Sequence, residues 1–99
     1  MSSKDNKIRI TWDGWSIEHI KKHNVNLSEV REVSRSKKVL RQSYLGRQII
    51  YGITKKKRLL TIVLSFELQK EGYVISARDM NLKERKVYEY EKNKTNKVV

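Results

Sequence analysis

Hydrophobic and polar positions alternate near the start of the chain, over residues 7–12. A period of two is typical of a strand with one buried face, so this stretch predicts a β-strand. Asp13-Gly14 interrupts the pattern. Apolar residues three apart follow Ser16, which is a good helix N-cap, and they predict a short helix that ends near Asn24.

A second helix is predicted directly afterwards. Asn26 precedes Glu29 by three residues, which is the spacing of a capping box, and Val25 and Val30 can form the hydrophobic staple around it. The apolar period of this helix runs to about Val33, and the polar, cationic residues that follow indicate a loop.

From Val39 the period returns to two, and turn residues divide the chain into short hydrophobic runs. These runs predict four strands of an antiparallel meander, at Val39–Tyr44, Gln48–Ile53, Arg58–Phe66 and Tyr73–Arg78. The third run is apolar on both faces, which predicts the central strand, covered by helices on one side.

A final helix is predicted at the end of the chain. Asn81 and Glu84 repeat the capping-box spacing, and the helix that they begin extends to about Lys92. The fold class is then α+β: one strand, two helices, a four-stranded antiparallel meander and a C-terminal helix.

The chain is long enough for one modest core. It has 99 residues, of which 37% are hydrophobic. We therefore expect one domain over residues 7–92, between a flexible N-terminus at residues 1–6 and a flexible basic tail at residues 93–99.

The charge balance favours an anionic partner. Lys and Arg number 23 against 11 Asp and Glu, which gives a formal net charge of +12, and RNA is the first candidate. An acidic protein partner or an inert basic surface is the alternative. The sequence contains no cysteine, no apolar stretch that could cross a membrane and no signal-peptide pattern. These features predict a cytoplasmic protein without membrane contact.

Two arginines and a tyrosine flank the junction between the last predicted strand and the final helix. Arg78 ends the strand, and Arg85 and Tyr88 lie three apart on the helix, so their side chains could converge on one phosphate. One guanidinium group can donate two hydrogen bonds to the oxygens of one phosphate. Arg78 and Arg85 are therefore candidates for stabilising the phosphorane of RNA cleavage. Alternatively, Arg78 forms an ion pair with Asp79 or Glu84.

His23 is the candidate general base or acid, because the ordinary pKa of a histidine, about 6.5, lies near neutrality. Alternatively, it caps the end of the first helix or interacts with the helix dipole. Tyr88 could supply a proton or stack on a base, or it packs between helix and sheet. His19 lies four residues before His23, the spacing of two metal ligands, but no third ligand stands at a matching distance. Neither a metal nor a cofactor is therefore predicted.

Clustered cations could follow an RNA backbone. The candidates are Lys21, Lys22, Lys55 and Lys56, with Lys22 favoured because it adjoins His23. Loop lysines are usually only solvated, so a basic surface without this role is the alternative.

Several short segments, in their order and spacing, resemble the BrnT family of toxins. They are Thr11-Trp12-Asp13, Ile20-Lys21-Lys22-His23-Asn24-Val25, Leu27-Ser28-Glu29-Val30, Gly46-Arg47, Ser76-Ala77-Arg78-Asp79-Met80, Glu84-Arg85 and Tyr88. The resemblance spans about residues 8–90. The chain departs from the family pattern at Asn24, where glycine is usual, and at Trp15 with His19, in a helix that is more often basic.

The resemblance implies a variant of the RelE fold and a metal-independent endoribonuclease that cleaves single-stranded RNA. It also implies a cognate antitoxin, BrnA-like and of the ribbon-helix-helix type, and a monomer or weak dimer in isolation. Arg47, which belongs to the matching segments, joins the candidate RNA-binding residues. The alternative function is a non-catalytic module that binds RNA or an antitoxin, as a degenerate toxin would.

Overall fold

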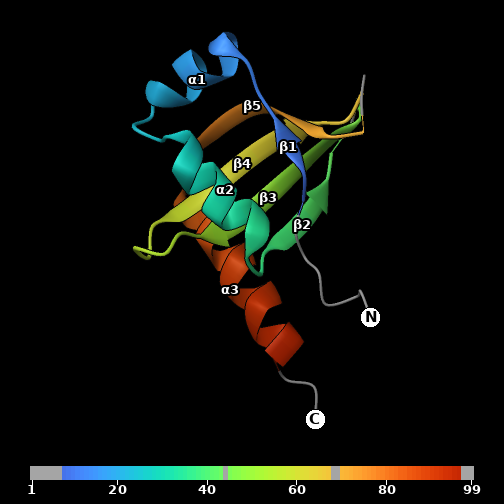
Figure 1. Ribbon diagram of the computed structural model, residues 1–99. Coiled ribbons are helices and arrows are strands. Elements are labelled where there is room, and N and C mark those ends of the chain that lie inside the picture. Colours follow the sequence, from blue (N-terminus) through green and yellow to red (C-terminus); the bar gives the residue numbers. More distant parts are fainter. Residues whose placement is uncertain (1–7, 44, 68–69, 97–99) are drawn as a thin grey trace.

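The computed structural model describes residues 8–43, 45–67 and 70–96 of the chain (Figure 1). Its elements, in chain order, are β1 (Ile10–Thr11), α1 (Gly14–Lys21), α2 (Leu27–Arg35), β2 (Val39–Gln42), β3 (Arg47–Ile53), β4 (Leu59–Ser65), β5 (Gly72–Asp79) and α3 (Leu82–Asn96). The α+β class and the order of elements predicted from the sequence are confirmed.

The sheet is mixed rather than wholly antiparallel. Its strand order is β1-β5-β4-β3-β2, so the predicted meander is present and β4 is its central strand, as the apolar run indicated. β1 has two residues and pairs in parallel with β5, with Ile10 beside Gly72 and Thr11 beside Tyr73. The first strand is therefore where the alternation predicts it, but it is shorter and parallel to its neighbour.

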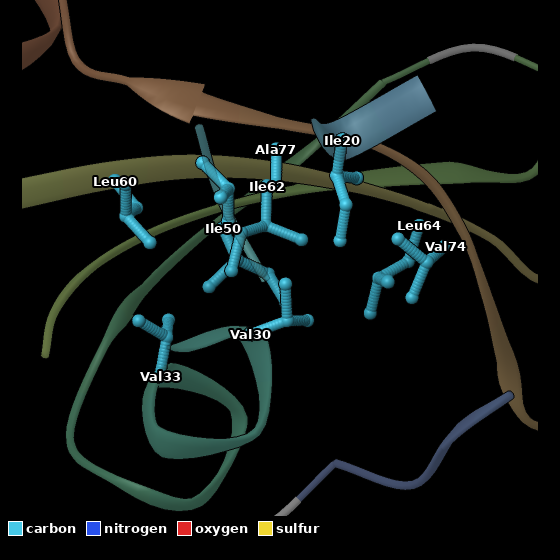
Figure 2. Packing of buried hydrophobic residues seen from close by; sticks show 10 residues of the cluster. Ile20, Val30, Val33, Ile50, Leu60, Ile62, Leu64, Val74 and Ala77 are labelled. Carbon is cyan, nitrogen blue, oxygen red and sulfur yellow. The ribbon is translucent and has the colours of Figure 1, made fainter. Parts of the chain in front are cut away.

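Helices cover both faces of the sheet. Neighbouring residues of β3 point in opposite directions, and Ile50 packs with α1 and α2 while Tyr51 packs with α3. Figure 2 shows side chains of the first face meeting between α2 and the strands. This core comprises Ile20, Val25, Val30, Val33, Ile50, Leu60, Ile62, Leu64, Val74 and Ala77. The expectation that helices lie on one side is wrong, because α3 docks on the other.

The cluster beneath α3 is smaller. Its buried members are Tyr51, Met80 and Tyr88, which join β3, the end of β5 and α3. At the far end of the helix, Arg41 of β2 forms an exposed ion pair with Glu91, at 3.7 Å. The α3 helix is therefore attached by one small apolar contact, by the polar groups near its start and by this ion pair.

The helix starts follow local hydrogen bonding. Asn26 and Glu29 form the predicted capping box of α2, and Asn81 and Glu84 exchange the same two hydrogen bonds at the start of α3. The N-cap of α1 is Asp13, however, and not Ser16. Ser16 is the third residue of that helix, is buried, and donates from Oγ to the carbonyl oxygen of Val74, at 2.9 Å.

Two element ends differ from the sequence pattern. The α2 helix extends to Arg35, and α3 extends past Lys92 to Asn96. Residues 93–96 are therefore helical, where a flexible tail was expected. Residues 1–6 and 97–99, to which the other flexible segments were assigned, lie outside the described residues, as does Tyr44 at the end of the predicted second strand.

The close approach of α2 to β3 depends on a glycine. A Cβ atom added at Gly52 would lie 2.6 Å from Cγ1 of Val33, which is well inside van der Waals contact. Leu45 and Gly46 both have positive φ, at 59° and 68°, and they form the hairpin turn before β3.

No helix in the described parts of the chain is both long and apolar enough to cross a membrane.

Candidate functional site

Arg58 ties together three parts of the chain at one end of the sheet. It lies just before β4, and its Nη1 and Nη2 atoms donate to the carbonyl oxygens of Asn24, at 2.7 Å, and His23, at 3.1 Å. Nη1 also contacts the carboxylate of Glu29 at 3.2 Å, and Nε donates to Oδ1 of Asp79 at 2.8 Å. A single guanidinium thereby fixes the turn between α1 and α2 against the end of β5.

Asp79 is the acidic centre of this cluster. Its side chain is 62% exposed, and the hydrogen bond from Arg58 is the largest cause that holds its pKa below the ordinary value. The positive charges of Arg85 and His23 act in the same direction. The guanidinium of Arg58 also holds the carbonyl of His23, so the turn after α1 lies beside the carboxylate of Asp79, six residues before Arg85 in the chain.

His23 and Arg85 keep their polar atoms available. Both side chains are exposed, and within the described residues neither has a hydrogen bond or ion pair from its ring or guanidinium atoms. The ring of His23 meets the ring of His19 edge to face, at 6.4 Å between centroids. The side chains of His23 and Arg85 are therefore both open to solvent.

Arg78 is used differently. It forms a two-bonded ion pair with Glu84, in which Nη1 and Nη2 each lie 2.8 Å from a carboxylate oxygen, and Nη1 also donates to the carbonyl of Asp79. The Glu84 hydrogen bond raises the pKa of Arg78. In the sequence, an ion pair with Glu84 stood as the alternative to a phosphate contact, and Arg78 makes that pair. Thr61, Arg78 and the backbone of Asn81 all donate to Glu84, whose pKa falls to about 2 mainly through Arg78.

Tyr88 is part of the packing beneath α3. It is 4% exposed, and burial raises the pKa of its phenol. The nitrogen of Lys92 lies 5.4 Å from its ring centroid, which is a cation–π contact within the same helix. The structure therefore gives Tyr88 the packing role that the sequence left as its alternative.

The lysine candidates divide between two places. Lys21 and Lys22 are exposed at the end of α1, beside His23. Lys55 and Lys56 lie in the turn between β3 and β4, which is the turn that Arg58 closes. Lys55 also lines an open hollow, together with two cations of α2, Arg31 and Arg35.

Arg47 lies away from this group. It begins β3, whereas the site adjoins the far end of that strand at Ile53, about 20 Å away for a strand of this length. Its Nε atom is buried and has no hydrogen-bond partner among the described residues. The sequence-predicted RNA-binding residues therefore do not all gather on one surface.

Arg58, Asp79 and Glu29 are members of the site that the sequence did not predict. In the sequence, Arg58 began the predicted third strand, and Asp79 was a possible partner for Arg78. The two pairs that Arg58 forms span 21 and 29 residues. The usable signal in the sequence was the sign of these two charges. Glu29 and Asp79 are carboxylates in a strongly basic chain, and a carboxylate is rarely buried without a cationic partner.

The cluster contains groups for acid–base chemistry and for holding an anion, and it contains a carboxylate that can stabilise a protonated imidazole. No three His, Cys, Asp or Glu residues within the described ranges come together as metal ligands would.

Comparisons with protein families, with curated proteins and with solved structures find no match for this chain.

Proposed function

We propose that this chain is a toxin-like, metal-independent endoribonuclease that cleaves single-stranded RNA. One observation carries the proposal: the guanidinium of Arg58 joins the backbone of His23 to the carboxylate of Asp79, six residues before Arg85, on a protein with a net charge of +12. Within the described residues, the side chains of His23 and Arg85 have no hydrogen-bond partner. An imidazole and a guanidinium that can reach one phosphate supply proton transfer and charge stabilisation. The BrnT-like segments of the sequence support the same activity.

The reaction uses the 2′-hydroxyl of RNA as its nucleophile. His23 accepts the proton of that hydroxyl, the 2′-oxygen attacks phosphorus, and Arg85 stabilises the pentacoordinate phosphorane. The bond from phosphorus to the 5′-oxygen then breaks, and the imidazolium returns a proton to this oxygen. The products are a 2′,3′-cyclic phosphate and a free 5′-hydroxyl.

Arg78 and Tyr88 act as supports in this proposal. Arg78 joins the end of β5 to the start of α3 through Glu84, and Tyr88 fills the apolar contact beneath the helix. Together they hold Arg85, on the first turn of α3, at the edge of the site. Loss of either side chain would reduce cleavage by displacing the helix.

The test is RNA cleavage by purified protein in EDTA. We expect the wild type to cut a single-stranded RNA and to leave cyclic phosphate ends, and we expect no cut at a nucleotide that lacks its 2′-hydroxyl. His23→Gln and Arg85→Ala should each lower the rate by about 10²-fold or more, the usual range for such groups.

Lys86→Ala is the matched control for Arg85, because Lys86 is an exposed cation on the same turn of α3. Its cleavage rate should stay close to that of the wild type. Equal cleavage by the wild type, His23→Gln and Arg85→Ala would mean that the activity belongs to a contaminant or to another part of the protein.

A second candidate function is a non-catalytic module that binds RNA or an acidic antitoxin. It is favoured by the pairing of Arg78 with Glu84 and by the burial of Tyr88, which engage two of the four predicted catalytic side chains in the fold. This function would be supported if RNA stays intact and cells grow normally at high expression, while the protein still binds RNA. Growth arrest with RNA cleavage would instead support the nuclease.

We further propose that an antitoxin neutralises the protein. A net charge of +12 favours an acidic segment that covers His23 and Arg85. A neighbouring gene for a ribbon-helix-helix protein would support this partner, and co-expression of that protein should restore growth and stop cleavage in vitro.

A further inference from the structure

Four rings form a row along α1 and onto β5. Trp15, His19 and His23 are spaced four residues apart, so they follow one face of the helix and the turn after it. Trp15 and His19 are stacked, with centroids 4.7 Å apart and planes 13° apart. Trp15 is also near-parallel to Tyr73, at 6.4 Å and 21°, and His19 meets His23 edge to face at 6.4 Å.

This row is a surface feature and not part of the core. The buried residues of α1 are Ser16 and Ile20, which face the sheet, whereas Trp15 is 52% exposed. A tryptophan with half of its surface in water leaves apolar area exposed. Exposed aromatic clusters commonly mark binding surfaces. Trp15 packs on His19 and Tyr73 and belongs to neither of the two buried clusters.

The row is held in place at its β5 end. The hydroxyl of Tyr73 donates to Oδ1 of Asp13 at 2.8 Å, and the same carboxylate oxygen caps α1 by accepting from the backbone of Ser16 at 3.1 Å. At the other end, Arg58 binds the carbonyl of His23. The side chain of Tyr73 is therefore anchored, which lowers the entropy lost when a ligand binds to it, and at the other end the backbone of His23 is held.

The row also ends at the proposed reaction site. Its last member, His23, is the candidate proton-transfer group, and Lys21 and Lys22 lie beside it. A ligand that lies along the rings from Tyr73 to His23 would bring its backbone to Lys21 and Lys22 and to the turn that Arg58 joins to Asp79. Single-stranded nucleic acids combine a charged backbone with flat rings in this way, and aromatic side chains bind them by stacking irrespective of sequence.

We infer that the aromatic row Tyr73, Trp15, His19 and His23 binds unpaired nucleobases of single-stranded RNA and guides the strand to the His23 and Arg85 site. The inference rests on the proposed function in its choice of ligand. Trp15 makes the central contact. The row recognises bases through their faces, so it selects unpaired over double-stranded RNA and has little sequence preference.

The experiment measures binding of the full chain to a 2′-O-methyl RNA decamer, which cannot be cut through its 2′-oxygen. Trp15→Ala should weaken binding by at least about 5-fold, the low end for one stacked base. Trp15→Phe should retain most of the affinity. The dependence of binding on salt should be the same in wild type and Trp15→Ala, because base stacking releases no counterions.

A decamer of the same length with abasic sugars provides the second measurement. It should bind the wild type and Trp15→Ala equally, since it carries the charge without the rings. Tyr90→Ala is the matched control protein, because Tyr90 is also an exposed aromatic, at 65%, but lies on α3. It should bind the intact decamer as the wild type does.

Three results would overturn the inference. Trp15→Ala could bind the intact decamer as well as the wild type, or it could lose affinity equally for the abasic decamer. In both cases RNA cleavage and the proposed function would stand. Absence of wild-type binding to any single-stranded RNA would remove the proposed function as well, and the row would then be a contact for a protein partner.

Discussion

The side chain of Glu84 is only 14% exposed, and its carboxylate accepts four hydrogen bonds from the protein. Its donors come from three elements: Thr61 on β4, Arg78 on β5 and the backbone of Asn81 at the start of α3. A carboxylate with this many donors is strongly stabilised in its charged form. Glu84 is therefore the residue through which α3 is fixed to the sheet, and its protonation should weaken that attachment.

The first prediction concerns the pH dependence of stability. The pKa of Glu84 is about 2 in the folded protein and 4.5 for an ordinary glutamate, so folding favours the charged form. The contribution is fully present above about pH 4.5 and is lost as the pH falls towards 2. In Glu84→Gln this contribution is absent, so its free energy of unfolding should fall less between pH 5 and about 3. Urea unfolding at several pH values measures the difference.

Glu89→Gln is the control for this experiment, because Glu89 is an exposed carboxylate on the same helix. Its pH dependence should match that of the wild type. Identical pH dependence for the wild type and Glu84→Gln would show that the ion pair with Arg78 contributes nothing measurable to stability.

At the scale of elements, the helix starts of α2 and α3 could be predicted from the sequence because a capping box is a local pattern. Asn26 and Asn81 each bond a glutamate three residues later, and nothing distant changes that choice. The sequence predicted Ser16 as the N-cap of α1, but the N-cap is Asp13, and Ser16 is the third helical residue that completes its capping box. Ser16 also bonds Val74, 58 residues away, a contact that no local pattern indicates.

The site was harder to predict than the elements, because it depends on contacts between residues that are far apart in the chain. The strand-to-helix junction that carries Arg78 and Arg85 is visible in the sequence, and so is the exposed histidine at the end of α1. Whether Arg78 contacts a phosphate or Glu84 depends on the geometry of that junction, which periodicity does not give. The bond from Arg58 to Asp79 is a long-range contact, with no local signal in either segment.

The second prediction concerns the packing of α2 on β3. Gly52→Ala should lower the free energy of unfolding by about 1 to 3 kcal/mol, because the new Cβ would overlap Val33. In a Val33→Ala background the same change should cost less, since the overlapping atom is gone. Chemical unfolding of the four proteins of this cycle measures the coupling.

Gly14→Ala is the matched control, because a Cβ there meets no atom within 4 Å. It lies on the first turn of α1 and should leave stability unchanged or raise it by up to about 1 kcal/mol. Equal costs of Gly52→Ala in both backgrounds would contradict a direct contact between the two positions.

At the scale of the whole molecule, charge opposes folding. A net charge of +12 on 99 residues means that compaction brings like charges together. The ion pairs of Arg58 and Arg78 relieve this near the candidate site, and that of Arg41 with Glu91 relieves it between β2 and α3. An anionic ligand bound there would relieve more of it, so binding and stability are coupled.

The third prediction follows from this charge. The melting temperature of the full chain should rise when NaCl increases from about 0.1 M to about 1 M, because the screening length falls from roughly 10 Å to roughly 3 Å. Salt also weakens the few ion pairs, but the excess positive charges outnumber them. A short polyphosphate at low salt should raise the melting temperature as well. A melting temperature that is insensitive to both additions would contradict net self-repulsion.

The α3 helix has its own small apolar contact, separate from the larger core on the opposite face of the sheet. Its release would break the Glu84 bonds and uncover Tyr51 and Tyr88, while the packing of α1 and α2 on the strands would remain. The molecule therefore has two levels of opening, a partial one with a lower free energy and a complete one. Because Arg85 leaves together with α3, the partial opening separates Arg85 from His23 without unfolding the protein.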